Sequence, residues 1–125
     1  MKAFYEEVIR RFPEVIQDEN EDFPYSVMGS LVDWLGSLGP SELTPEVVRR
    51  VVEFTKWCEE QPRGETAADD LYTVLVVGFY EGLFRTEETR SLIPRLIPKD
   101  DFISNAEYLK TWVGAENYQL ALEKY

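Results

Sequence analysis

The sequence predicts an all-α fold: an irregular single-domain bundle of six to seven short helices around a central apolar helix at about residues 66–84. Apolar residues recur at helical spacing, helix start and stop signals punctuate the chain, and no repeat of fixed period is visible. The 125 residues fit one domain, 1–125, and a hydrophobic content of 44% is sufficient for a buried core. We therefore expect one compact helical unit.

Two amphipathic segments open the chain. In residues 2–12, Phe4, Val8 and Phe12 lie four residues apart, which predicts a first helix. Pro24 suits the first turn of a second helix, because proline has no backbone N–H to leave unpaired there. The apolar face of this second helix carries Val27, Leu31, Trp34 and Leu38. We expect Gly39-Pro40 to end it, with Gly39 in the left-handed conformation.

The third helix and the central helix have distinct start signals. Thr44-Pro45-Glu46 supplies a hydroxyl cap, a first-turn proline and a carboxylate near the positive helix end. Thr66-Ala67-Ala68-Asp69 resembles a capping box, and it precedes the most apolar stretch, residues 71–84. This stretch is apolar on nearly every face, so the other helices should surround it. Gly78 and Gly82, four residues apart, should let another helix approach closely.

Three further helical segments complete the bundle. Thr86-Glu87-Glu88 starts a fifth helix, which Pro94 should shorten or kink and Pro98 should end. Ser104-Asn105-Ala106-Glu107 has the pattern of a full capping box and opens a helix that closes at Gly114. A last amphipathic segment with Tyr118, Leu122 and Tyr125 runs to the end of the sequence.

The overall charge constrains the partners. Acidic residues number 24 against 13 basic ones, which gives a net charge of -11. Such a surface repels nucleic acid phosphate and anionic lipid and attracts a basic protein. We expect a cytoplasmic protein with no nucleic acid or membrane partner, since the N-terminus lacks a secretion signal and no apolar run is long enough for a membrane span. The single cysteine, Cys58, is compatible with a reducing compartment.

The acidic bias peaks in Asp18-Glu19-Asn20-Glu21-Asp22, which lies between the first two predicted helices and is followed by two aromatic residues. We predict that this run and the aromatic pair dock a basic partner that carries an apolar group. The candidate partner-binding residues are Asp18, Glu19, Glu21, Asp22, Phe23 and Tyr25. The alternative is a solvated linker. A calcium loop is disfavoured, because Phe23 stands where such a loop needs glycine and Gly29 stands where it needs glutamate.

Catalytic chemistry has few candidates. The chain has no histidine, which removes the commonest general base and the usual zinc sites. Cys58 lies on the apolar stripe of the third helix, where a thiol behaves as a small hydrophobe. Asp33 and Glu81 each interrupt an apolar helix, and together they would suit a carboxylate- or metal-dependent enzyme if they met in one cleft. The alternative is that each points outward or pairs with an arginine. We predict no cofactor, no metal site and no catalytic residue.

Three segments carry a resemblance to known proteins: Phe4-Tyr5-Glu6-Glu7, Tyr25-Ser26-Val27-Met28-Gly29 and residues 76–83. The chain resembles small acidic all-helical bacterial proteins of uncharacterised families. Some of these look like immunity proteins, which neutralise a toxin by occluding its active site. The resemblance implies a non-catalytic inhibitor or adaptor with a basic protein partner, such as a toxin. A third possibility is a homo-oligomeric structural module, which would bury surplus aromatic residues against its own copy. The oligomeric state, monomer or homodimer, is open at this point.

Overall fold

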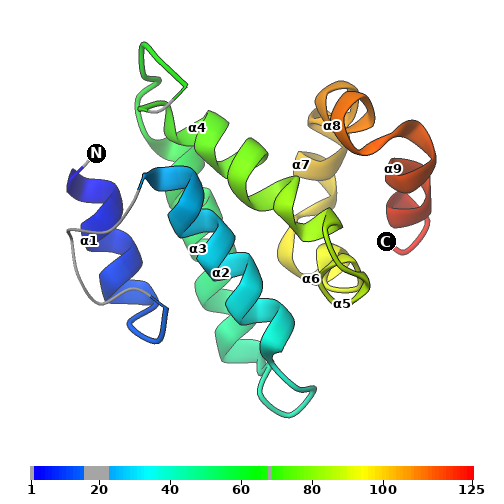
Figure 1. Cartoon of the computed structure of the whole chain (residues 1–125), viewed down its shortest axis with the longest axis horizontal. Coiled ribbons are helices and arrows are strands. Elements are labelled where there is room, and N and C mark those ends of the chain that lie inside the picture. The colour runs from blue at the N-terminus through cyan, green and yellow to red at the C-terminus, as the bar shows by residue number, and fades with distance from the viewer. Residues whose placement is uncertain (1, 16–22, 68) are drawn as a thin grey trace.

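The computed structural model describes residues 2–15, 23–67 and 69–125, and every regular element in these residues is a helix. The elements are α1 (Lys2–Arg11), α2 (Pro24–Ser37), α3 (Pro45–Glu60), α4 (Leu71–Thr73), η1 (Val74–Tyr80), η2 (Gly82–Phe84), α5 (Glu87–Arg90), α6 (Ile93–Leu96), α7 (Lys99–Ser104), α8 (Ala106–Val113) and α9 (Ala115–Leu122). In Figure 1, α1 to α3 occupy one end of the molecule, α7 to α9 occupy the other, and α4, η1 and η2 cross between them. The all-α prediction is confirmed. None of the described helices is both long and apolar enough to cross a membrane.

The N-terminal end of the molecule is held together by aromatic packing. Phe4 and Phe12 of the first segment are fully buried, and both pack against Phe54 of α3. Phe12 meets Phe54 edge to face at 5.5 Å between ring centroids, and it also contacts Trp34 of α2 at 6.1 Å. Edge-to-face pairs are the favourable geometry for aromatic rings. The four-residue spacing of Phe4, Val8 and Phe12 therefore marks the buried face of α1 and of the residue that follows it.

The central segment approaches α2 through its glycines. A Cβ atom on Gly78 would lie 2.8 Å from Met28 Cβ, and one on Gly82 would lie 3.2 Å from Val32 Cγ2. Both positions thus permit a backbone approach that a larger residue would block. The predicted close approach is confirmed, and its partner is α2.

Several helix ends follow the predicted capping chemistry, and one does not. Pro24 is in the first turn of α2, and Thr44 caps α3 by accepting a hydrogen bond from the Val47 N–H at 3.3 Å. Gly114 ends α8 with a φ of 93°, the one positive value in the described residues. The prediction of a left-handed Gly39 is wrong, because α2 ends at Ser37 and Leu38 continues in an extended conformation.

The central helix begins later than predicted, at Leu71 rather than about residue 66. Its cap is Asp70, which accepts a hydrogen bond from the Thr73 N–H at 3.2 Å. Thr66 and Asp69 do bond to one another, but in a turn that precedes the helix. From Val74 to Tyr80 the segment is a π-helix, η1, where the sequence predicts an ordinary α-helix.

The C-terminal end is more broken than predicted. The expected fifth helix is divided into α5 and α6, with Pro94 in the first turn of α6. The predicted capping box at Ser104 is wrong, because Ser104 is the last residue of α7 and its hydroxyl donates to the Asp101 carbonyl. Phe102 of α7 stacks on Tyr118 of α9 at 4.5 Å and fixes these short helices to one another.

Candidate protein-interaction surface

Two aromatic residues mark the beginning of α2. Phe23 is the N-cap residue and is 56% exposed, although it is a large hydrophobic side chain. Its ring lies 5.5 Å from the ring of Tyr25, whose hydroxyl donates a hydrogen bond to the Ala67 carbonyl at 2.7 Å. Tyr25 is thus oriented by a contact 42 residues away in sequence, and Phe23 rests against it. The Phe23 ring is therefore exposed to solvent, and it packs on a tyrosine that a hydrogen bond holds in place.

The predicted acidic residues precede this aromatic pair in the chain. Asp18, Glu19, Glu21 and Asp22 lie outside the described residues. Phe23, the first described residue after them, follows Asp22 directly. Of the six candidate partner-binding residues, the structure therefore places Phe23 and Tyr25 and brings these two together.

An apolar groove of about 260 Å³ lies between the central segment and the junction of α7 with α8. Its lining residues are Arg63, Tyr72, Thr73, Val76, Val77, Asn105 and Tyr108. The Tyr72 hydroxyl donates to the Asn105 side-chain oxygen at 3.3 Å, so the two walls of the groove are joined by a hydrogen bond. A groove of this size with few polar groups suits an apolar side chain of a partner.

The α8 side of the groove ends in a second aromatic pair. Tyr108 and Trp112 lie one helical turn apart with their ring centroids at 6.2 Å, and Trp112 is 64% exposed. The Tyr108 hydroxyl donates to Glu81 Oε2 at 3.0 Å. Burial and the Glu81 carboxylate raise the pKa of Tyr108, so its hydroxyl stays protonated and remains a donor. The Tyr25 ring of the first aromatic pair also lies against the central segment, because a Cβ atom on Gly78 would be 3.5 Å from Tyr25 Cδ1.

Arg63 closes one end of the groove but carries little free positive charge. Its guanidinium donates to both carboxylate oxygens of Asp70, each at 2.8 Å, and it also lies over the Tyr72 ring at 5.1 Å. The Arg63 hydrogen bonds hold the pKa of Asp70 well below its usual range. The Asp70 carboxylate therefore neutralises Arg63, and the groove does not repel a basic partner.

The two carboxylates of the alternative enzymatic hypothesis have different surroundings. Asp33 is exposed on α2 and lines a pocket of about 300 Å³ that Arg85 and Thr86 also line, and Glu81 is not among the residues of that pocket. Glu81 instead accepts the hydrogen bond from Tyr108. In the part of the chain that the structure describes, no three carboxylate or thiol side chains are grouped so that they could hold a metal ion. The arrangement thus gives Glu81 a positioning role at the aromatic groove.

Cys58 is part of the core. Its side chain is fully buried, and burial raises the pKa of the thiol to about 12. A thiol with this pKa is protonated at neutral pH and is a poor nucleophile. The sequence-based interpretation of Cys58 as a small buried hydrophobe is confirmed.

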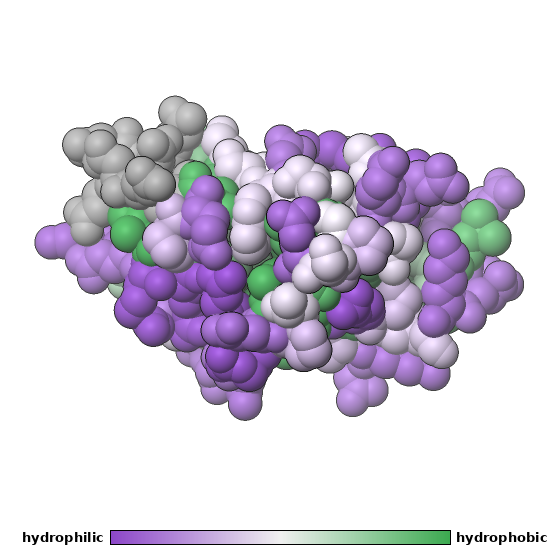
Figure 2. Space-filling model, turned by 90° about the horizontal axis from the view of Figure 1, so that it is seen from below, coloured by the Kyte–Doolittle hydropathy of each residue, from purple (hydrophilic) through white to green (hydrophobic). Residues whose placement is uncertain are grey.

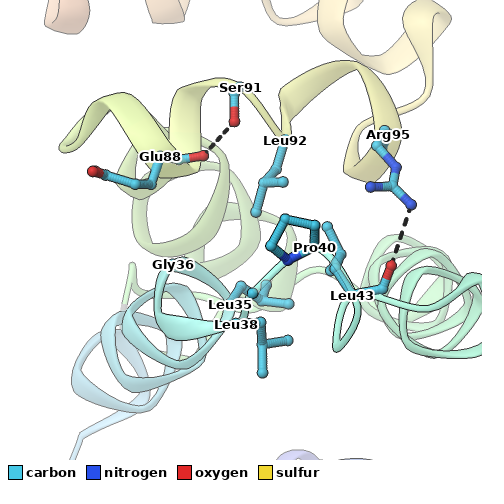
Figure 3. Close-up of a pocket in the computed structure, with 10 residues that line it drawn as sticks. Leu35, Gly36, Leu38, Pro40, Leu43, Glu88, Ser91, Leu92 and Arg95 are labelled. Carbon is cyan, nitrogen blue, oxygen red and sulfur yellow. Dashed lines mark hydrogen bonds between the residues drawn. The ribbon is translucent and has the colours of Figure 1, made fainter.

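A second pocket, of about 320 Å³, lies between the end of α2 and helices α5 and α6 (Figure 3). In Figure 3 the side chains of Leu35, Leu92 and Leu43 gather around Pro40, with Glu88 and Arg95 on opposite sides. The Arg95 guanidinium is 3.5 Å from the Leu43 carbonyl, at the long end of hydrogen-bonding distance. The pocket is a mainly aliphatic hollow with Glu88, Ser91 and Arg95 at its edge.

Figure 2 shows one face of the molecule, seen from below the view of Figure 1. Hydrophilic residues cover most of it, and hydrophobic residues show only as small separate patches. Scattered patches of this kind are normal on a protein surface. The exposed large hydrophobic residues in the described part of the chain are Phe23, Ile103, Trp112 and Leu120. Of these, Phe23 and Trp112 each belong to one of the two aromatic pairs, and Tyr108, the ring partner of Trp112, lines the groove.

Sequence reasoning selected Phe23 and Tyr25 but missed the groove. Trp112 and Tyr72 stand out in the sequence only as surplus aromatics, and Tyr108 has no signal beyond its four-residue spacing from Trp112. They come together because Asn105 and Tyr108 are hydrogen-bonded to Tyr72 and Glu81, at either end of the central segment. Comparisons of this chain with protein-family models, with curated proteins and with solved structures found no match.

Proposed function

We propose that this chain is a non-catalytic acidic protein-binding protein, an immunity-type inhibitor or adaptor that docks a basic partner. The observation that carries the proposal is the pair of aromatic side chains, Phe23 and Trp112, that remain exposed beside hydrogen-bonded tyrosines. Tyrosine and tryptophan supply large contact areas with a polar handle and dominate binding energy at protein interfaces. The aromatic surface consists of Phe23, Tyr25, Tyr72, Tyr108 and Trp112.

The chemistry of the partner follows from the surroundings of this surface. An apolar side chain of the partner enters the groove between Tyr72 and Tyr108, and its lysine or arginine residues meet the acidic run from Asp18 to Asp22. The net charge of -11 steers a basic protein to this chain before any contact forms. A toxin that binds phosphate with lysine and arginine has such a surface.

Binding is favoured over catalysis by the kind of groups that the surface offers. The surface offers aromatic rings, the hydroxyls of Tyr25, Tyr72 and Tyr108, which are each hydrogen-bonded within the protein, and the Arg63 guanidinium, which is paired with Asp70. Such groups position a partner but do not transfer protons or act as nucleophiles at neutral pH.

Capture of the partner and substitution of the aromatic residues test the proposal. The immobilised chain is incubated with lysate of the cell of origin at low salt, bound protein is eluted with salt and identified by mass, and its affinity is then measured. Phe23→Ala and Trp112→Ala should each weaken binding at least about tenfold, as truncated interface hot spots do. The matched control is Leu120→Ala, which truncates an equally exposed residue on α9. Equal affinities for all three variants and the unmodified chain would refute the proposed surface.

The role of the acidic run is tested by charge reversal. The double substitution Asp18→Lys and Glu21→Lys should slow association with the partner about tenfold at low salt. It should also weaken the salt dependence of the association rate. Lysine at both Glu116 and Glu123, which are exposed on or next to α9, changes the net charge by the same amount and serves as the control. Equal slowing in both variants would assign the effect to net charge alone and remove the acidic run from the docking site.

A second copy of the chain is a less suitable occupant of the aromatic surface. Each copy carries a net charge of -11, so the mutual repulsion opposes self-association. Light scattering over a wide concentration range separates the two cases. If the unmodified chain is a dimer and Trp112→Ala is a monomer, the aromatic surface is an interface between two copies of the chain and does not bind a basic partner.

A further inference from the structure

The hollow of about 320 Å³ shown in Figure 3 combines an aliphatic lining with Arg95 at its rim. Its buried leucines are Leu35 and Leu43, and its half-buried leucines are Leu38 and Leu92. Sites for small molecules are concave and mostly apolar, with a few polar groups that orient the ligand, and this volume is at the lower end of their range. The hollow therefore suits a small ligand with an aliphatic body.

Arg95 brings an unpaired positive charge to the hollow. Its guanidinium is 3.5 Å from the Leu43 carbonyl, and this single long contact leaves most of its N–H donors free. Among the described residues, no carboxylate lies within ion-pairing distance of Arg95, whereas Arg50 and Arg63 each pair with one. A guanidinium with free donors binds a carboxylate through two parallel hydrogen bonds. The charge at the rim is thus complementary to a carboxylate.

Two other polar groups at the rim are already hydrogen-bonded within the protein. The Ser91 hydroxyl donates to the Glu88 carbonyl at 2.6 Å, and the Gly39 N–H donates to Glu42 Oε1 at 2.9 Å. In Figure 3 the Glu88 side chain extends away from the leucine side chains. A peptide in the hollow would bring amide groups that need partners, whereas an alkyl chain needs none. A plain aliphatic chain is therefore a better occupant than a peptide segment.

We propose that this hollow binds a medium-chain aliphatic carboxylate. The alkyl chain of the ligand packs against Leu35 and Leu43, and its carboxylate accepts hydrogen bonds from the Arg95 guanidinium. None of the residues that line the hollow belongs to the aromatic surface. The site is therefore separate from the surface proposed to dock a basic partner, and either site can exist without the other.

Titration of the isolated chain with octanoate tests the site. In NMR spectra, the methyl signals of the four leucines and the Nε–H signal of Arg95 should shift and reach saturation. The affinity should rise about threefold for each methylene added from butanoate to octanoate, because each methylene leaves water for the aliphatic lining. Shifts that do not saturate, or that acetate produces as strongly as octanoate, would overturn the site.

Substitution of Arg95 tests the role of the charge. Arg95→Gln should weaken octanoate binding about tenfold and leave the binding of octanol, which has the same chain without the carboxylate, unchanged. The matched control is Arg90→Gln. Arg90 is an exposed arginine whose Nε also donates to a backbone carbonyl, that of Phe84, but it does not line the hollow. Equal weakening by both substitutions would assign the effect to net charge and overturn the role of Arg95.

A third comparison separates a free aliphatic acid from the end of a polypeptide. N-acetyl-leucine carries the amide and the carboxylate of a chain terminus, and it should bind more weakly than octanoate. Tighter binding of N-acetyl-leucine would assign the hollow to a protein ligand and overturn a free aliphatic acid as its occupant. None of these titrations uses a protein partner, so failure of this site and failure of the proposed binding function give different results.

Discussion

Replacement of Asp70 by alanine should destabilise the protein, because this one carboxylate joins the loop before α4 to the helix itself. Its Oδ1 atom accepts hydrogen bonds from Arg63 Nε at 2.8 Å and from the Gly64 N–H at 2.9 Å. Its Oδ2 atom accepts from Arg63 and from both the backbone N–H and the hydroxyl of Thr73. Asp70 is only 4% exposed, so alanine would leave several of these donors without a partner inside the protein.

The expected loss can be assembled from these contacts. Removal of an N-cap costs about 1 kcal/mol. The hydrogen bonds from Gly64 and the Thr73 hydroxyl add about 1 kcal/mol each when they have no replacement, and water can replace part of the former because Gly64 is exposed. The Arg63 side chain is 69% exposed, so its ion pair adds little. We expect the free energy of unfolding to fall by about 2–3 kcal/mol.

Urea denaturation followed by far-UV circular dichroism at neutral pH measures this loss. The matched control is Asp33→Ala, because Asp33 is an exposed aspartate within α2, and we expect it to change stability by less than about 0.5 kcal/mol. If Asp70→Ala is no less stable than Asp33→Ala, the capping role of Asp70 is refuted.

The same carboxylate should make folding sensitive to acid. The Arg63 hydrogen bonds, which outweigh the opposing effect of burial, hold the pKa of Asp70 below its ordinary value of 3.8. Its stabilising contribution is therefore present above about pH 3.8 and is lost as the pH falls below that value. In Asp70→Asn, the difference in stability from the unmodified chain should shrink as the pH is lowered from about 4 to 2.

Three further substitutions or reactions probe the core. Phe54→Ala, which removes the ring that Phe4 and Phe12 share, should lower the free energy of unfolding by about 3–5 kcal/mol in urea denaturation. Gly78→Val should cost about 1–3 kcal/mol in the same assay, because its Cβ would meet Met28 at 2.8 Å, and a cost below that of an exposed control would contradict the close packing of α2. Cys58 should react with a thiol reagent only as fast as the protein unfolds, because the thiol is buried and its pKa is about 12. Rapid modification of the folded chain would show instead that the thiol is accessible.

Helix starts could be predicted from the sequence where the capping chemistry is local. Pro24 and Thr44 act within one turn of their own helices, and both were identified correctly. The start of the central helix was misplaced because two carboxylates compete for the role. Asp69 bonds to Thr66 as the capping pattern suggests, but Asp70 caps the helix while Arg63 and Gly64 bind its other oxygen. That second set of contacts depends on the folded path of the loop and has no signature in the sequence.

The candidate site likewise contains some residues that the sequence reveals and others that only the fold reveals. Phe23 and Tyr25 are visible in the sequence because they adjoin the acidic run, whose own four acids remain predictions. Tyr108 is not visible, because the carboxylate that orients it is Glu81, 27 residues earlier in the chain. In the sequence, Glu81 stands out only as a polar interruption of an apolar segment. Its role as a hydrogen-bond acceptor for a tyrosine emerged only from the packing of α8.

The π-helix η1 explains how one segment serves both the core and the groove. Its hydrogen bonds reach five residues back, as from the Glu81 N–H to the Val76 carbonyl at 2.9 Å, whereas an α-helix reaches four. The wider turn changes which residues share a face, so an α-helical reading of residues 71–84 assigns the wrong faces. In the structure, the buried Tyr80 donates to the half-buried Glu59, and the next residue, Glu81, accepts from Tyr108 at the groove. Irregular helices of this kind occur frequently at functional sites. Here the irregularity puts a buried tyrosine that packs in the core and a carboxylate that orients Tyr108 on consecutive residues.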